Sequence, residues 1–247
     1  MKRSLFFVSF SLVLTLGFYW TLTCFEKHAP PKIPVKAIAQ TGPLKEGLKI
    51  DVLAEILQLS SDEPRLIESK EAKEILLKMP FLKTAEVSLL NSGTLYIDYT
   101  LRRPLLTLSD FENAAIDEEG ILFPLSPYFT PKRLPELFLG LDRALPWGTE
   151  FNSPKFHLTR RLIQLLKEEV IRIDISKIEE GSLGKREIVV LLDKGENIHY
   201  LRLTPSHYEK QLEYYQLLFS NLEKKDLIID LRLPHLAYIR TCSKSLR

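Results

Sequence analysis

The chain has 247 residues, of which 45% are hydrophobic, so it is long enough to bury one large core or two modest ones. Its 34 basic and 32 acidic residues nearly cancel, which leaves a formal charge of +2. This balance argues against the concentrated basic surface on which nucleic-acid binding depends, and the paired basic residues are scattered along the chain.

The first predicted element is a transmembrane helix at residues 4–25, after a cytoplasmic tail at residues 1–3. The run from Ser4 to Phe25 contains no charged residue. As a helix it would span about 33 Å, enough for the roughly 30 Å hydrocarbon core of a bilayer. Tyr19 and Trp20 lie near its far end, where aromatic rings favour the headgroup boundary.

Three alternatives, a cleaved secretory signal, a lipoprotein signal and a buried core helix, fit this segment less well. A buried core helix would be less uniformly apolar around its circumference. A secretory signal has a shorter apolar core and a small-x-small exit, which the residues before the first charge lack. A lipoprotein signal needs a small residue before Cys24 and a large aliphatic residue three positions before it, where Thr23 and Thr21 stand. The positive charges on the two sides of the segment nearly balance, so they do not orient it.

A Pro-rich linker at residues 26–34 leads into a predicted small α+β unit at residues 35–107. It would begin with a strand at Val35–Gln40. Asp51 is a plausible N-cap for a helix that runs to about Leu59, and Ser69 for a second helix that Pro80 closes. Both helices carry apolar residues at helical spacing.

The apolar period then changes to two, which predicts a β-hairpin. Ala85, Val87 and Leu89 alternate with polar residues, and Asn91-Ser92-Gly93 is a hairpin signal. The apolar side of the returning strand holds Leu95, Ile97, Tyr99 and Leu101. The predicted order is therefore strand, helix, helix, strand, strand, in which two helices can cover one face of a three-stranded sheet.

Residues 108–241 are predicted to form a β-rich unit with packed helices, followed by a tail at residues 242–247. One helix would run from Pro154 to about Val170 with Ser153 as its cap, and another would open at Thr204-Pro205. Strands are expected at Ala114–Ile116, Ile121–Phe123, Ile171–Ile175, Glu187–Leu192, Ile198–Leu203, Leu227–Leu233 and Leu236–Thr241.

The sequence offers no legible catalytic or metal site. Cys24 and Cys242 lie at opposite ends of the chain, and the five histidines do not cluster. Asp117, Glu118 and Glu119 could be imagined as paired carboxylates, but they read more simply as a turn that Gly120 closes. Nucleophile-elbow, HExxH, P-loop and dinucleotide motifs are missing from the sequence. We therefore expect a protein that is not an enzyme and binds no cofactor or metal.

Six segments follow the N-terminal anchor in this order: Leu76–Val87, Thr94–Ile97, Arg102–Leu105, Ala115–Phe123, Leu134–Gly140 and Ile228–Arg232. Together they resemble the FtsQ/DivIB family of bacterial cell-division proteins. The chain departs from the family pattern at Leu233, where an aromatic residue is usual, and in its short cytoplasmic tail.

This resemblance implies a single-pass protein of the inner (cytoplasmic) membrane with its body outside the cytoplasm, in the periplasm. The body would consist of a POTRA domain and a larger β domain. The family recruits and holds coiled-coil division proteins, the FtsB/DivIC-like and FtsL-like partners, at the septum during septal peptidoglycan synthesis. Two alternatives remain, a POTRA-bearing chaperone or transport component of the envelope and an anchored wall hydrolase.

The predicted partner-binding site is the end of the chain. The last strand has no later element to cover it, so its outer edge can offer unpaired backbone groups to a partner strand. On this strand Leu236, Tyr238 and Arg240 would share one face, with Ala237 and Ile239 on the other. The alternative is an edge that only completes the sheet. The candidate residues are Ile228, Asp230, Arg232, Leu236, Ala237, Tyr238, Ile239 and Arg240.

Overall fold

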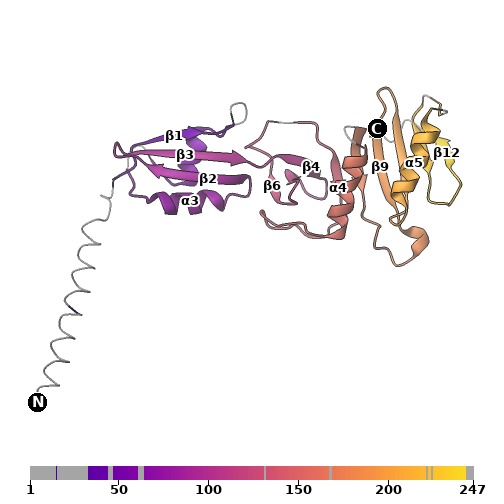
Figure 1. The fold of residues 1–247 in the computed structure, drawn as a ribbon, viewed down its shortest axis with the longest axis horizontal. Helices are drawn as coiled ribbons and strands as arrows, with labels where there is room; N and C mark the ends of the chain where they lie inside the picture. Colours follow the sequence, from indigo (N-terminus) through magenta and orange to yellow (C-terminus); the bar gives the residue numbers. More distant parts are fainter. Residues whose placement is uncertain are drawn as a thin grey trace, which may run out of the picture.

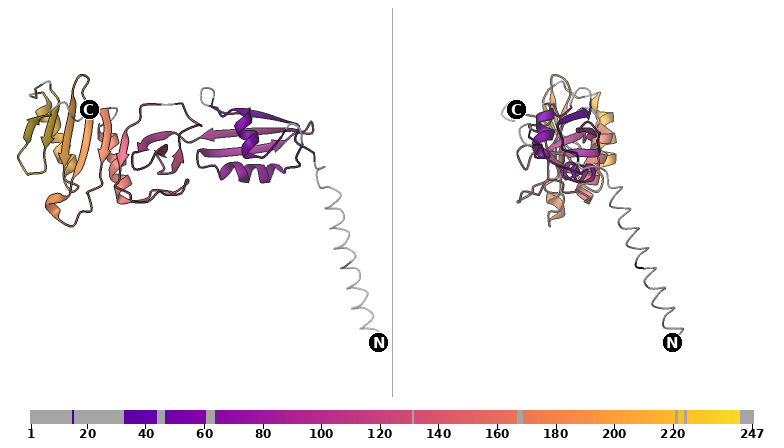
Figure 2. Two further views of the ribbon diagram at one scale, coloured as in Figure 1. Left: turned by 180° about the vertical axis from the view of Figure 1, so that it is seen from behind. Right: turned by 90° about the vertical axis from the view of Figure 1, so that its left-hand side faces the viewer.

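A computed structural model describes residue 15 and residues 33–43, 47–60, 64–130, 132–166, 169–220, 222–223 and 225–242. These residues form an α+β fold with two sheets, arranged end to end as an elongated body (Figure 1; from behind and from one end, Figure 2). We call residues 35–102 the smaller unit and the residues from 104 onward the larger unit.

The smaller unit has the predicted order of elements. They are β1 (Ala37–Thr41), α2 (Ile50–Ile56), α3 (Ser69–Leu77), β2 (Leu82–Leu89) and β3 (Thr94–Leu101). The sheet order is β1-β3-β2, with β1 parallel and β2 antiparallel to β3. Both helices pack on one face, where Leu53 and Leu76 are fully buried. The alternation along β3 is confirmed, because Leu95, Ile97, Tyr99 and Leu101 are all buried.

Neither predicted N-cap of the smaller unit is correct. Helix α2 begins at Ile50 after Lys49, so Asp51 lies inside its first turn. Helix α3 is preceded by Glu68, and Ser69 is its first residue. The Ser69 hydroxyl instead accepts a hydrogen bond at 3.0 Å from the N–H of Leu89 in β2. The Ser69 side chain, predicted to cap the helix, therefore bonds to a neighbouring strand instead.

The larger unit is built on a nine-stranded mixed sheet of order β12-β11-β10-β9-β8-β7-β4-β5-β6. Pairing is parallel at β4–β7, β7–β8 and β10–β11, and antiparallel elsewhere. The strands are β4 (Pro104–Leu108), β5 (Ala114–Asp117), β6 (Leu122–Pro124), β7 (Glu136–Phe138), β8 (Val170–Asp174), β9 (Ile188–Asp193), β10 (Ile198–Leu203), β11 (Leu227–Asp230) and β12 (Tyr238–Thr241).

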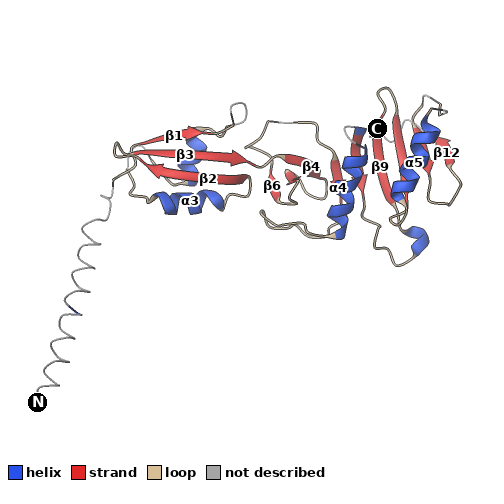
Figure 3. Cartoon of the chain, viewed as in Figure 1, coloured by secondary structure: helices blue, strands red, loops and turns tan. Residues whose placement is uncertain are grey.

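Two helices, α4 (Pro154–Leu166) and α5 (Tyr208–Phe219), cover one face of this sheet, and a short 3-10 helix spans Leu183–Lys185 (Figure 3). Ser153 caps α4 as predicted, since its hydroxyl accepts the N–H of Phe156 at 3.3 Å. The helix ends earlier than predicted, because Val170 already belongs to β8. Leu162 and Leu212 contribute to the same buried core as the covered sheet face.

Two strands of the larger sheet, β4 and β7, have no counterpart among the predicted strands. Because β4 starts at Pro104, the chain passes from one sheet to the other between Leu101 and Pro104, not at the predicted boundary after Thr107. The predicted final strands are also shorter in the structure. Leu231 and Leu233 follow β11, and the left-handed backbone of His235 (φ 60°) delays the start of β12 to Tyr238.

The predicted cytoplasmic tail at residues 1–3, the transmembrane segment except Thr15, most of the linker, and the C-terminal tail after Cys242 lie outside the described residues. Within the described part of the chain, none of the helices combines the length and apolar character that a membrane crossing requires.

Candidate partner-binding edge

The predicted binding strand is the last strand of the larger sheet, at the end of the body far from the smaller unit (Figure 1). β12 pairs with β11 alone, in antiparallel register from Leu227 opposite Thr241 to Asp230 opposite Tyr238. The opposite edge of this sheet differs. Backbone bonds link Leu122 of β6 to Gly148 and Thr149, at 2.8 and 3.0 Å, and so cover it. Within the described residues, β12 is thus the uncovered end of the larger sheet.

The hydrogen-bond phase of β12 identifies which backbone groups face outward. The N–H of Cys242 donates to the carbonyl oxygen of Asp226 at 2.8 Å. Directly opposite residues in an antiparallel pair alternate between bonded and non-bonded pairs. The backbone groups of Tyr238 and Arg240 therefore also face β11. Those of Ile239 point away from the sheet, where an added strand could pair with them.

The side chains around this edge are exposed although several are large and apolar. All four residues of β12 are exposed, and Tyr238 reaches 64% and Ile239 40%. Leu233 and Leu236, in the turn before the strand, are 64% and 65% exposed. A cluster of exposed apolar residues beside an open strand edge is typical of a protein-interaction surface.

The two faces of β12 have different surroundings. Ile239 lies opposite Ile229, a buried residue of the core under the helices. Opposite residues of neighbouring strands share a face, so Ile239 lies on the helix-covered side. Tyr238 lies opposite Asp230, and their side chains belong to the open face of the sheet. The predicted alternation of Tyr238 and Ile239 is therefore present, whereas Leu236 and Ala237 lie in the turn before the strand.

An ion-pair network on the open face supports the strand next to β12. Asp230 pairs with Arg232, whose Nη2 lies 2.8 Å from Asp230 Oδ2. Arg202 in β10 approaches the same oxygen to 3.2 Å, and its Nε donates to Glu187 at 2.9 Å. Arg232 and Lys177 each lie 3.2 Å from Glu187 as well. We call Lys177, Glu187, Arg202, Asp230 and Arg232 the charged ladder.

The charged ladder keeps both carboxylates ionised. Burial acts to raise the pKa of Glu187, but hydrogen bonds from Arg202 and Lys177 outweigh burial, so the pKa falls below its ordinary value. The pKa of Asp230 is lowered in the same way, by Arg232 against burial. Asp230 and Arg232 were predicted as partner-binding residues, and the structure pairs them with each other. Glu187 and Arg202 were missed, because their sequence separation gave no signal that β9 and β10 would bring them together.

The other polar clusters are structural. Asp117 Oδ1 accepts the backbone N–H groups of Glu119 and Ile121 at 3.0 and 2.9 Å, as expected of a turn residue. Buried His199 is bonded through Nδ1 to the hydroxyl of Tyr215 at 2.7 Å. In the described part of the chain, no three His, Cys, Asp or Glu residues gather closely enough to hold a metal ion.

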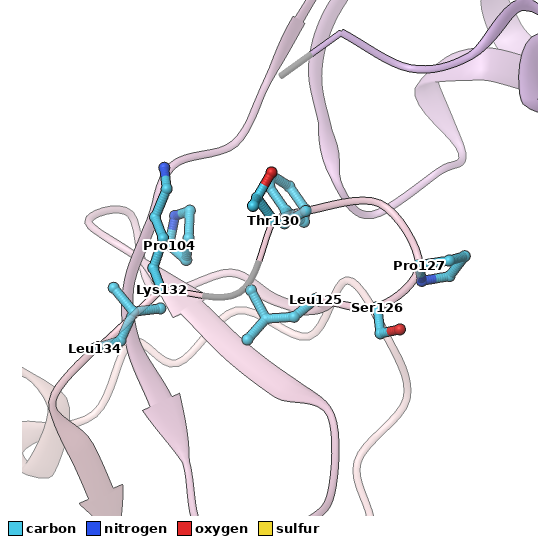
Figure 4. A pocket seen from close by; sticks show the side chains of 8 residues that line it. Pro104, Leu125, Ser126, Pro127, Thr130, Lys132 and Leu134 are labelled. Carbon is cyan, nitrogen blue, oxygen red and sulfur yellow. The ribbon is translucent and has the colours of Figure 1, made fainter. Parts of the chain in front are cut away.

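A groove of about 460 Å³ lies beside the start of the larger unit (Figure 4). Its walls are mainly apolar, with Lys132 as the charged residue in the lining. This composition brings together no catalytic group. The lining residues are Pro104, Leu125, Ser126, Pro127, Phe129, Thr130, Lys132 and Leu134.

Comparison of the chain with protein-family models and with curated proteins finds no match.

Proposed function

We propose that the chain is a membrane-anchored scaffold of the FtsQ/DivIB type, which holds FtsB/DivIC-like and FtsL-like proteins at the division septum. The observation that carries the proposal is the outer edge of β12, where the backbone groups of Ile239 point away from the sheet. An added partner strand would continue the sheet there and gain main-chain hydrogen bonds. The order β1, α2, α3, β2, β3 supports a POTRA-like assignment of the smaller unit.

The mechanism is recruitment by strand addition. Backbone pairing provides affinity, and the exposed side chains of Tyr238 and Ile239 provide the two faces that a partner strand would contact. The charged ladder fixes β11 behind β12, so the edge is held in an extended conformation before the partner arrives. A site that is already ordered loses less conformational entropy on binding.

Proline substitution at Ile239 tests the proposal, because it removes an outward N–H and leaves the bonds between β11 and β12 in place. We expect Ile239→Pro to weaken capture of the coiled-coil partners from solubilised membranes about fivefold, since one hydrogen bond contributes about 1 kcal/mol. Ile239→Thr alters the side chain but keeps the N–H, and should bind more tightly than Ile239→Pro.

Val87→Pro is the matched control on the smaller unit, because Val87 lies on the edge strand β2. The N–H of Leu90 donates to Thr94 of β3, so by alternation along β2 the N–H of Val87 points away from the sheet. Capture by this variant should equal that of the wild type. Circular dichroism would check that all three variants are folded. Wild-type capture by folded Ile239→Pro would contradict the proposal.

A fluorescent tag on the C-terminus separates this proposal from the alternative of an envelope chaperone. Under the scaffold proposal the tagged full-length chain should gather at the division plane. An even distribution around the envelope would favour the chaperone.

A further inference from the structure

The β5–β6 hairpin of the larger unit is buried on both faces. Ala114, Ile116 and Leu122 point into the core beneath α4 and α5. Ala115 and Phe123, which alternate with them, belong to the core of the smaller unit. Each of these five residues is at most 2% exposed. A single hairpin therefore forms a wall of two cores, and separating the units would expose one side of it to water.

Aromatic rings extend this contact between the units. The ring of Phe81, which lies just before β2, stacks on that of Tyr128 from the larger unit, with centroids 3.8 Å apart and planes inclined by 21°. Phe129 of the larger unit packs against Phe123, with ring centroids 5.5 Å apart, and so joins the core of the smaller unit to which Phe123 belongs. Phe81 is only 1% exposed. Stacking of this kind is directional, so it restricts rotation of one unit against the other.

Four charged residues complete the junction. Arg102 Nη1 lies 2.7 Å from Asp117 Oδ2 and 2.9 Å from Glu119 Oε2. Lys83 Nζ lies 2.6 Å from Glu119 Oε1. Lys83 and Arg102, whose backbone N–H donates to Phe81, belong to the smaller unit, whereas both carboxylates belong to the β5–β6 hairpin. We call these four residues the ionic latch.

The turn that carries Glu119 is itself held in place. Gly120 has a φ of +85°, and a side chain there would approach the carbonyl oxygen of Phe151 to 2.8 Å and the ring of Phe156 to 2.9 Å. The N–H of Phe151 donates to Gly120 at 2.8 Å. These contacts hold the hairpin turn against the segment before α4, so the position of Glu119 in the ionic latch is fixed relative to the larger unit.

We infer that the two units are one rigid body, in which the β5–β6 hairpin is a shared wall and the ionic latch fixes the angle between the sheets. The smaller unit then acts as a rigid spacer. It sets the distance and orientation of the β12 edge relative to the N-terminal end of the body, at the opposite end in Figure 1. The rigid arrangement needs no partner and does not depend on strand addition at β12.

Pulsed electron paramagnetic resonance on the full chain tests it. Spin labels at Lys70→Cys on α3 and Gln164→Cys on α4, both exposed positions, report the distance between the units once Cys24 and Cys242 are replaced by serine. We expect one narrow distance distribution for this background. Combining Tyr128→Ala with Glu119→Lys, which removes the stacked ring and sets a lysine against Lys83 and Arg102, should broaden it.

Glu179→Lys is the matched control, because it reverses an exposed carboxylate that pairs with Lys155 at 2.9 Å within the larger unit. Its distribution should stay narrow. A broad distribution in the unaltered background would overturn the inference. So would an unchanged narrow distribution in the Tyr128→Ala, Glu119→Lys chain with native circular dichroism, since the contacts named here would then not hold the angle.

Discussion

The two terminal strands β2 and β12 show how the same molecule closes one sheet edge and leaves another open. At β2, the hydroxyl of Ser69 occupies the outward N–H of Leu89. Lys73 of α3 forms an ion pair at 2.7 Å with Glu86, whose side chain lies on the other face of β2. The lysine side chain therefore crosses the outer edge of the strand. At β12, both side-chain faces are exposed and the described residues supply no comparable cover. An edge that is not blocked is one that a partner can use.

The supports behind the two edges also differ in burial. Glu86, which guards β2, has a side chain that is 73% exposed, whereas Glu187, which holds the charged ladder behind β12, is 9% exposed. An exposed pair contributes little because water and salt screen it. A buried carboxylate is costly to remove because its cations lose their partner. The ion pair that covers the β2 edge is thus exposed, whereas the ion pairs behind the β12 edge centre on a buried carboxylate.

The largest expected effect sharpens this contrast. Glu187→Gln should lower the free energy of unfolding by about 2 kcal/mol, since Arg202 and Arg232 would keep Asp230 but lose the hydrogen bonds to a buried carboxylate. Glu86→Gln, its matched control on the guarded edge, should cost at most about 0.5 kcal/mol. Urea unfolding of both variants at pH 7 measures the difference. Equal losses would show that burial does not distinguish the two edges.

The second prediction concerns pH. Burial, together with the charge of Lys194, lowers the pKa of His199 below its ordinary value of 6.5. The unfolded chain therefore binds this proton more readily than the folded chain does. The stability from neutral His199 is fully present above about pH 6.5 and is lost as the pH falls from there through the lower folded pKa. The smaller unit has no histidine, so this sensitivity belongs to the unit that carries β12.

Urea unfolding at pH 7.5 and 5.5 checks this prediction. His199→Gln should lose less stability between these pH values than the wild type does. His157→Gln, at an exposed histidine of α4, should keep the wild-type dependence. The prediction fails if His199→Gln and the wild type lose the same free energy between the two pH values.

The smallest expected effect would break the contrast between the edges. Ser69→Ala combined with Lys73→Ala frees the N–H of Leu89 and removes the pair with Glu86. The free energy of unfolding should fall by no more than about 1.5 kcal/mol. The uncovered β2 edge should let the protein self-associate, which sedimentation velocity would detect as a concentration-dependent dimer. A variant that self-associates no more than the wild type would show that these contacts do not close the edge.

Local pattern was sufficient to predict the smaller unit and most of the larger one. Alternation located β3 and β10 because their buried residues, such as Ile97 and Leu201, recur at every second position. It could not locate β4 and β7. β7 has only three residues and β4 begins at a proline, so neither has the run of alternating residues that marks a strand in the sequence. Pairing with neighbouring strands, such as Thr107 opposite Glu136, makes them strands. Ser69 was predicted to cap a helix because of its place in the sequence. Its hydroxyl bonds to β2 instead, and the pairing of distant segments decides that contact.

The sequence by itself determined which residues of each segment share a face, and that the last strand carries Tyr238 and Ile239 on opposite sides. Those properties follow from the two-residue period of a strand. Only the tertiary structure decided that β6 is covered while the described residues leave β12 uncovered, that Glu187 meets Arg202, and that Arg102 joins two sheets. Those contacts depend on which strands become neighbours, and sheet order is set by the packing of whole layers on each other.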